Sequence, residues 1–412
     1  MKTVDVNGRS YSWPSVPTVV VCIDGSEPDY IERAVADGVM PYTREMLERG
    51  ANLRAACVVP SFTNPNNLSI VTGRPPAVHG VSGNYFLDPD SGREVMMNDP
   101  RFLRAPTIFK AFQDQGARIC IITAKDKLRA LLGHGLRFGP DGAICFSSEK
   151  AAQANLAENG IDGVVEMVGM PVPDVYSAEL SEFVFAAAVK LIHSRRPDIM
   201  YLSTTDYVQH KFAPGSAPAN AFYAMMDRYW RQLDDAGAVL ALTADHGMNA
   251  KHDASGAPDV IYLQDALDEW LGAGRARVIL PITDPYVVHH GALGSFATAY
   301  LPPDADIEGV AARIRALPGI EYAEGRRAAC ARFELPQDRL GDVVVVSTRN
   351  KVIGTSPQKH DLSGLDAPLR SHGGVSEQTV PLIINRPLHR NPKRSGLRNF
   401  DVFDLALNHT RA

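Results

Sequence analysis

Val19-Val-Val-Cys-Ile-Asp24 is an unbroken apolar run that ends in a carboxylate, and Ala241-Leu-Thr-Ala-Asp245-His246-Gly247 repeats this pattern later in the chain. Short apolar runs bounded by turn residues are typical of strands that are buried on both faces of a parallel sheet. Runs of the same texture predict strands over residues 18–23, 51–58, 117–123, 198–202 and 238–243. These runs decide the fold, because a sheet built from them must be covered on both sides.

Amphipathic patterns lie between the predicted strands. They predict helices over residues 105–115, 177–193 and 219–235, the last with Phe222, Met225, Met226 and Leu233 three, four or seven positions apart. The alternation predicts an α/β fold with a central, mostly parallel sheet and helices on both faces. Asp24, Asp206 and Asp245 then follow directly after strand carboxyl ends, the edge of such a sheet where ligands bind.

The texture changes after His252, where proline and glycine become frequent and the apolar runs shorten. Here we predict strands over residues 296–300, 322–335 and 342–347 and a helix over 307–317. A strand over residues 379–385 and a helix over 399–407 then return to the alternation of strands and helices predicted for the first part of the chain. The sequence therefore predicts a core of residues 1–254 and 369–412, into which a small α+β cap of residues 255–368 is inserted.

Composition excludes several classes of protein. A net charge of −5 over 412 residues, without a polybasic run, argues against a nucleic-acid partner. The N-terminus lacks the apolar region of a secretory signal, and no segment reaches the ~18 consecutive apolar residues of a membrane span. We therefore expect a cytoplasmic protein with no membrane partner. The five cysteines are odd in number and form no Cys-x-x-Cys pair, which favours buried thiols over disulfides.

Seven scattered side chains have the right chemistry to surround two metal ions: Asp24, Thr63, Asp206, His210, Asp245, His246 and His372. Mixed oxygen and imidazole ligands suit Zn²⁺, and the same set accepts Mn²⁺ or Fe²⁺. A pair of such ions can clamp both the attacking and the leaving group of a phosphoryl transfer. The chain is therefore predicted to be a metallohydrolase.

Local spacing supports part of this ligand set. Asp206 and His210 are four residues apart, which can place both on one face of a helical turn, although a solvent-facing pair has the same spacing. Gly247 permits a sharp turn after Asp245-His246, and two glycines follow His372. The nine other histidines, His252 and the pair at positions 289 and 290 included, are expected to be structural or cap residues.

Thr63 is the candidate nucleophile. The stretch Pro60-Ser-Phe-Thr63-Asn-Pro65 predicts a strand-to-helix turn with Thr63 near the helix start. A helix N-terminus favours a phosphoryl group and an alkoxide, and an adjacent divalent ion would lower the hydroxyl pKa further. A threonine that merely caps the helix is the alternative, and only the ligand set elsewhere favours the nucleophile.

Five ordered motifs contain these residues and together resemble the alkaline phosphatase superfamily: Val-Cys-Ile-Asp24-Gly-Ser, Ser61-Phe-Thr63-Asn-Pro-Asn-Asn-Leu-Ser-Ile-Val-Thr-Gly, Asp206-Tyr-Val-Gln-His210, Thr-Ala-Asp245-His246-Gly-Met and Ser-His372-Gly-Gly-Val. Nearly the whole chain is similar to the phosphonoacetate hydrolase branch. The resemblance implies an alkaline-phosphatase-like core with two Zn²⁺ ions. One would be held by Asp206, His210 and His372, and the other by Asp24, Asp245, His246 and the Thr63 oxygen.

The resemblance also implies substrate contacts. It places Asn84 against a phosphonate oxygen and Lys125 and Lys127 near a substrate carboxylate. Two ammonium groups just beyond the strand predicted at 117–123 suit a small anion at the sheet edge, although a solvated charged loop is the alternative. The expected reaction is zinc-dependent hydrolysis of the carbon–phosphorus bond of phosphonoacetate to acetate and phosphate, through a phosphothreonine at Thr63.

Two other functions stay open at this point. A phosphodiesterase or nucleotide pyrophosphatase of the same superfamily would use the same metal ligands. A non-catalytic phosphonate-binding protein is less favoured, because a binder has no use for the Thr63 hydroxyl. In each case the partner is a small molecule, and the sequence leaves a homodimer open.

Overall fold

The computed structural model describes residues 2–284, 291–363, 365–389 and 396–410, so the histidines at 289 and 290 lie outside the described residues. Within these ranges the predicted apolar runs form one seven-stranded sheet with the order β4-β19-β10-β3-β9-β7-β8. Its strands are β3 (Thr18–Cys22), β4 (Ala51–Ala56), β7 (Ile119–Thr123), β8 (Ile144–Ser147), β9 (Ile199–Ser203), β10 (Val239–Thr243) and β19 (Thr379–Ile384).

The sheet is mostly parallel, as predicted. β10, β3, β9, β7 and β8 run parallel to one another, and β19 is antiparallel to both β10 and β4. β8 was not among the predicted strands. Because the five parallel strands share one direction, the loops at their carboxyl ends meet along a single edge of the sheet.

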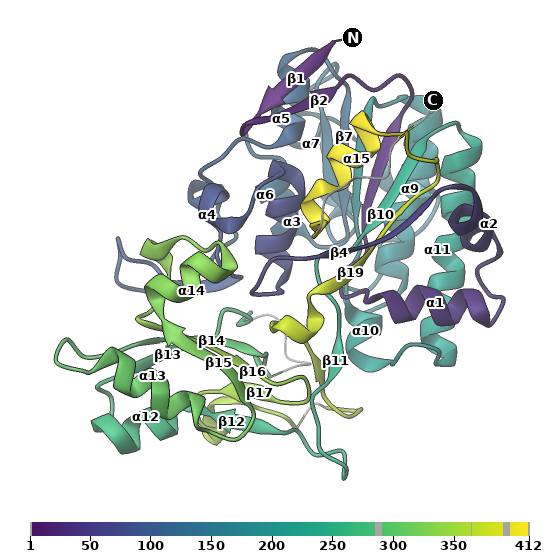
Figure 1. Cartoon of the computed structure of the whole chain (residues 1–412). Coiled ribbons are helices and arrows are strands. Elements are labelled where there is room, and N and C mark those ends of the chain that lie inside the picture. Colours follow the sequence, from purple (N-terminus) through teal and green to yellow (C-terminus); the bar gives the residue numbers. More distant parts are fainter. Residues whose placement is uncertain (1, 285–290, 364, 390–395, 411–412) are drawn as a thin grey trace.

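Helices cover both faces of this sheet (Figure 1). Alternate residues of β3 separate the two layers, since Val19 and Val21 belong to one apolar cluster and Val20 and Cys22 to the other. The first layer contains α1 (Pro28–Ala36), α2 (Pro41–Arg49), α9 (Glu179–Ser194) and α11 (Ala217–Asp235). The second contains α3 (Thr63–Thr72), α5 (Ile108–Asp114), α6 (Asp126–Leu132) and α15 (Val402–Asn408).

Short elements fill the connections of the core. The strand pairs are β1 (Thr3–Val6) with β2 (Arg9–Ser12), and β5 (Tyr85–Leu87) with β6 (Glu94–Met96). The helices are α4 (Pro76–His79), α7 (Leu156–Asn159), α8 (Val164–Val168) and α10 (Tyr207–Lys211). All five cysteines are buried free thiols, and no helix of the described ranges has the length and apolar character that a membrane crossing requires.

A second, smaller sheet lies to one side of the core, in the green segment of Figure 1. Its order is β13-β14-β16-β15, with antiparallel neighbours throughout. The strands are β13 (Arg277–Ile279), β14 (Phe296–Tyr300), β15 (Ile320–Gly325) and β16 (Val343–Ser347), and the helices beside them are α12 (Leu263–Leu271), α13 (Ile307–Arg315) and α14 (Arg326–Phe333). We call residues 255–368 the cap, and its exact boundaries stay a prediction.

One predicted element of the cap is wrong. Residues 322–335 were expected to form one strand, but β15 ends at Gly325 and α14 follows at once. The segment Arg326-Arg-Ala-Ala-Cys-Ala-Arg332 is rich in good helix formers, whose preference outweighs the apolar residues at its ends.

Two short strand pairs lie on either side of the boundary between cap and core, and one aromatic contact crosses it. β12 (Val260–Tyr262) pairs with β17 (Val352–Gly354), and β11 (Asn249–Ala250) pairs with β18 (Arg370–Ser371) where the chain leaves and re-enters the core. Phe62, just before α3, packs its ring edge-on against Phe296 of β14, with the ring centroids 6.4 Å apart. The cap therefore lies directly beside the segment that carries Thr63.

Candidate active site

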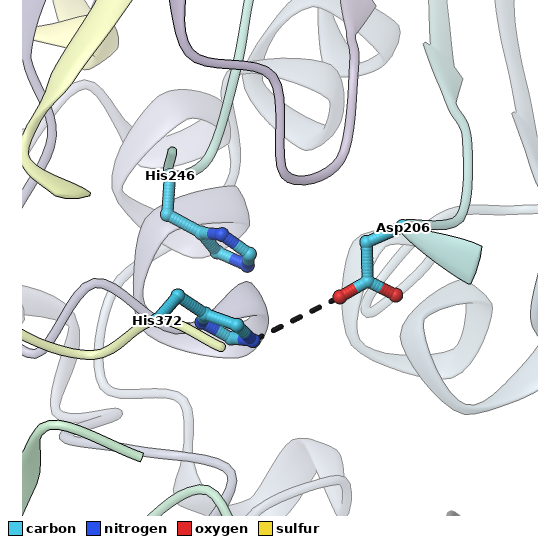
Figure 2. Close-up of side chains that lie close together, drawn as sticks. All are labelled: Asp206, His246 and His372. Carbon is cyan, nitrogen blue, oxygen red and sulfur yellow. Dashed lines mark ion pairs between the residues drawn. The ribbon is translucent and has the colours of Figure 1, made fainter. Parts of the chain in front are cut away.

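The predicted metal ligands meet at the carboxyl edge of the large sheet. Ligand atoms of Asp24, Asp245 and His246 lie within 4.8 Å of one another, and so do those of Asp206, His246 and His372. Figure 2 shows the second group, with the His246 and His372 rings stacked and both directed at the Asp206 carboxylate. His210 joins it, since its Nε2 is 2.9 Å from Asp206 Oδ2. His246 thus belongs to both groups of the cluster.

Each histidine of the cluster is oriented by a backbone carbonyl. The Nδ1–H of His210 donates to Arg370 O at 2.8 Å, that of His246 to Gly247 O at 2.9 Å, and that of His372 to Ser61 O at 2.8 Å. A carbonyl only accepts, so the proton of the neutral ring is on Nδ1 and the Nε2 lone pair faces the cluster. Outer hydrogen bonds of this kind are how proteins orient metal-binding imidazoles.

Two atoms in the cluster have no hydrogen-bond partner. Asp24 Oδ1 and His246 Nε2 are both buried and lack a partner among the described residues, although they lie 3.3 Å apart. Buried acceptors that face each other need a positive charge between them. The residues present therefore fit divalent cations.

The pKa values of the carboxyl groups in the cluster also indicate a site for cations. Burial, followed by the charges of Asp206 and Asp245, raises the pKa of Asp24 well above its usual range. Burial also raises the pKa of Asp245. For Asp206 burial acts in the same direction, but the neighbouring histidines, His210 first, outweigh it and hold the pKa well below normal. Asp24 and Asp245, buried close to each other and to Asp206, are stabilised as carboxylates when bound cations replace their protons.

Glycines allow the close packing of the ligand loops. Gly373, directly after His372, has φ of +121°, and a Cβ there would lie 2.6 Å from the Phe62 ring. Gly247 differs from the expectation, because it is not in the left-handed region. It is required by space instead, since a Cβ would meet Glu27 at 3.1 Å and the Glu377 carbonyl at 3.3 Å.

Thr63 is the first residue of α3, and the capping alternative is wrong. The N-cap position is Phe62, which has no side chain able to cap, so the Thr63 hydroxyl is not used to start the helix. Pro65 occupies the first turn, and Asn67 Nδ2 donates to the Thr63 carbonyl at 3.1 Å. The hydroxyl therefore belongs to a residue at the positive end of a buried helix.

A pocket joins Thr63 to the metal-ligand cluster and to the predicted substrate residues. It is lined by Asp24, Thr63, Asn64, Asn84, Met96, Asn98, Thr123, Lys125, Lys127, Leu128, Ser203, Thr204, Thr205, Asp206, His210, Ile282, Asp284 and His372. Asp245 and His246 lie beneath it with no exposed surface. All the predicted site residues are thus brought into one region.

The predicted substrate residues have defined partners. The Asn84 side-chain carbonyl accepts from the Asn64 N–H at 3.0 Å, which leaves the amide NH₂ as the group that can donate to a ligand. Lys125 Nζ lies 5.5 Å from the centre of the Tyr176 ring. Lys127 Nζ lies 2.6 Å from both carboxylate oxygens of Asp284, a residue of the cap. Both lysines line the pocket, and their contact with the substrate stays a prediction.

Two residues of the site were not predicted from sequence. Asn67 donates to Asp245 Oδ2 at 3.2 Å and accepts from Tyr201 OH at 2.7 Å. Its signal was present in the run Asn64-Pro-Asn-Asn67, because asparagines are poor helix formers and three of them in a helix that is buried throughout need a polar task. Asp284 gave no signal, since its partner Lys127 is 157 positions away.

Known proteins resemble the chain over nearly its full length. Residues 18–374 match the family model described as type I phosphodiesterase / nucleotide pyrophosphatase. A phosphonoacetate hydrolase from Sinorhizobium meliloti 1021, solved in complex with phosphonoacetate, is 62% identical in sequence with a TM-score of 0.96, and the match covers 98% of each chain. The alkaline phosphatase PafA matches 96% of each chain with a TM-score of 0.66 at 16% identity, a similarity of fold alone.

Curated relatives match shorter stretches. An uncharacterised pyrophosphatase/phosphodiesterase of Schizosaccharomyces pombe is 25% identical over 252 residues, which are 56% of this chain and 44% of that protein. A phosphonoacetate hydrolase of Penicillium oxalicum is 66% identical over 29 residues, which are 7% of this chain and 40% of that sequence. The matches therefore span less than half the length of these two relatives.

Proposed function

The chain belongs to the type I phosphodiesterase / nucleotide pyrophosphatase family and is a hydrolase of the alkaline phosphatase superfamily, and we propose that it cleaves the carbon–phosphorus bond of phosphonoacetate to give acetate and phosphate. The observation that carries the proposal is the pocket itself. It is lined by Thr63 and metal-ligand side chains, which we call its metal end, and by Lys125 and Lys127, which we call its carboxylate end. This pocket occurs in a chain 62% identical to an enzyme solved with phosphonoacetate.

Two divalent cations complete this site in our proposal, and Zn²⁺ suits the ligands best. Asp206, His210 and His372 would hold one, and Asp24, Asp245, His246 and the Thr63 oxygen the other, with His246 close to both groups. Bound there, the cations would lower the pKa of the Thr63 hydroxyl and neutralise charge on the phosphonate oxygens.

The residues of the chain supply positioning and charge for the first step. The Thr63 hydroxyl loses its proton to water and its oxygen attacks phosphorus, and the carbon–phosphorus bond breaks with its electron pair leaving on carbon. The N-terminus of α3 and the Asn84 amide bind the phosphonate oxygens during this step. Carbon leaves readily only when its charge spreads into the adjacent carboxylate, so an ammonium group beside that carboxylate, Lys125 or Lys127, stabilises the departing enolate. A proton from water then converts it to acetate.

The second step regenerates the enzyme. Water attacks the phosphothreonine at Thr63, the oxygen–phosphorus bond breaks, and phosphate leaves with the threonine hydroxyl restored. The same helix N-terminus and Asn84 hold the phosphoryl group through both steps. A single set of donors therefore serves two in-line displacements.

Product analysis tests the proposal. Zinc-loaded protein incubated with phosphonoacetate should release acetate and phosphate in equal amounts, and Thr63→Ala should release neither. Lys125→Met should raise KM and lower kcat together, because Lys125 contacts both ground state and departing enolate. Hydrolysis of bis-p-nitrophenyl phosphate or a dinucleotide, with no release from phosphonoacetate and no response to Lys125→Met, would instead identify a phosphodiesterase. Binding of phosphonoacetate without turnover would identify a binding protein.

A further inference from the structure

One charge in the pocket comes from the cap and opposes the expected substrate. Asp284 follows β13 and lines the same pocket as Thr63. Both of its carboxylate oxygens lie 2.6 Å from Lys127 Nζ. The side chains are largely buried, with 16% of Asp284 and 30% of Lys127 exposed. The pair is therefore a well-formed contact between the cap and the core at the predicted carboxylate end of the pocket.

The segment that carries Asp284 is fixed to the other substrate residue. The backbone N–H groups of Asn84 and Tyr85 both donate to the Pro281 carbonyl, at 2.9 and 3.2 Å. Ile282 is 2% exposed and packs in the apolar core of the cap. Asp284 is thus held at a defined place beside Lys127 and Asn84, as expected for a residue that shapes the pocket.

We propose that Asp284 is a specificity-determining residue whose carboxylate occupies Lys127 in the substrate-free enzyme and exchanges with the carboxylate of the substrate. This inference rests on the proposed function. The Asp284 group and the carboxylate of phosphonoacetate are the same chemical group and compete for the same ammonium. A ligand with its own carboxylate replaces the lost pairing, whereas a ligand without one leaves Lys127 bound to Asp284. Asp284 therefore weakens the binding of carboxylated phosphonates selectively and leaves the binding of phosphonates without a carboxylate unchanged.

Removing the competing charge should strengthen binding of carboxylated ligands. In Asp284→Asn the neutral amide keeps the size of the side chain but no longer neutralises Lys127. We expect KM for phosphonoacetate to fall about 5- to 10-fold, because one partly exposed charge interaction contributes about 1 kcal/mol. The inhibition constant of phosphonoformate should fall similarly, and that of methylphosphonate, which has no carboxylate, should change less than about 2-fold.

A control separates this effect from a change in overall charge. Asp338 of the cap pairs with Arg104 of the core outside the pocket, so Asp338→Asn makes the same substitution in the same kind of contact. It should leave KM and both inhibition constants unchanged. In the Lys127→Met background, Asp284→Asn should no longer give its gain through Lys127, so the two substitutions should be clearly non-additive.

Three outcomes would overturn the inference. A rise of KM in Asp284→Asn would mean that Asp284 positions Lys127 for the substrate. An equal fall for phosphonoformate and methylphosphonate would mean that Asp284 acts only through the general field of the pocket. Additivity with Lys127→Met would mean that the two groups do not share a ligand. Failure of the proposed function is a separate result, since the unaltered protein would then not hydrolyse phosphonoacetate.

Discussion

The two ends of the pocket are built in different ways. At the metal end each imidazole is held by a backbone carbonyl that takes no part in the reaction, so the ligand atoms are oriented before any cation or substrate arrives. At the carboxylate end Lys127 and Asp284 hold each other across the boundary between core and cap. The first arrangement can stay unchanged through a reaction, whereas the second has to rearrange for an anion to bind.

The metal end is further supported by a buried ion pair. Lys251 and Glu377 have no exposed surface, and Lys251 Nζ lies 2.9 Å from Glu377 Oε1. The same ammonium donates to Ser295 Oγ and the Arg349 carbonyl in the cap. Glu377 Oε2 accepts from the Gly374 N–H, two residues after His372, and the Glu377 carbonyl accepts from the Gly247 N–H, next to His246. This pair ties both histidine loops to the cap.

The largest expected effect comes from the metal end. His372→Asn places an amide nitrogen where Nδ1 was, so it keeps the bond to the Ser61 carbonyl and loses only the Nε2 that faces the cluster. Turnover should fall by more than the about 10- to 100-fold that accompanies the loss of an outer partner of a metal ligand. Steady-state kinetics measures the loss of turnover, and metal analysis measures the loss of bound zinc that should accompany it.

The paired variant is His372→Gln, which keeps a polar atom near the Nε2 position and loses the bond to Ser61. Its turnover should fall by about 10- to 100-fold, and it should retain more zinc than His372→Asn. A His372→Asn protein with full zinc content and normal turnover would contradict the assignment of His372 as a ligand.

A smaller but clear effect is expected from the buried ion pair. Lys251→Met leaves the Glu377 carboxylate buried without its counter-charge and should lower the free energy of unfolding by about 3–5 kcal/mol. The double variant Lys251→Met/Glu377→Leu removes both charges and should lose less than the single variant. Urea unfolding of the chelator-treated protein measures both, since bound metal would add its own stabilisation.

The matched control is an exposed pair of the same charges. Arg54 and Glu32 are 60% and 51% exposed, and Arg54→Met should cost less than about 1 kcal/mol. If Lys251→Met cost no more than Arg54→Met, the buried pair would not support the metal end, and the contrast between the two ends would lose its basis.

The clustering of the metal-ligand candidates could be predicted because of a property of parallel sheets. Apolar runs that end in Asp24, Asp206 and Asp245 must deliver these residues to one edge, whatever the details of the loops. The carbonyl partners of the histidines could not be predicted in this way. Ser61 and Arg370 are 311 and 160 positions from the rings they bind, and no local pattern marks a backbone carbonyl.

The carboxylate end was predicted only in part, for a related reason. Lys125 and Lys127 follow β7 and were assigned through the family resemblance, with which their position at the sheet edge agrees. Asp284, and Glu377 behind the metal end, resemble ordinary surface carboxylates in the sequence. Their partners lie 157 and 126 positions away.

The helix α14 was missed because apolar spacing alone does not separate a short strand from a short buried helix, and Gly325 ends the strand early.

The smallest expected effect concerns a titratable residue behind the metal end. Glu27 packs against the Gly247 turn, and burial raises its pKa to about 7, against the opposing charge of Arg370. A carboxyl group whose pKa is raised by folding favours the folded state below its unfolded pKa of about 4.3. That advantage is lost as the pH rises toward 7, so the Glu27 carboxylate destabilises the protein at alkaline pH.

Glu27→Gln should therefore stabilise the chelator-treated protein at pH 8 by about 2–3 kcal/mol and have little effect at pH 4.5, because the shift is about 2.5 pKa units at about 1.4 kcal/mol each, reduced for partial exposure. Urea unfolding at both pH values measures the difference, with Glu48→Gln on the exposed face of α2 as the control that should show none. A gain of equal size at both pH values would mean that Glu27 acts through packing. In that case the Glu27 charge would not destabilise the metal end, which would be held by the carbonyl hydrogen bonds of its histidines and by the Lys251–Glu377 pair.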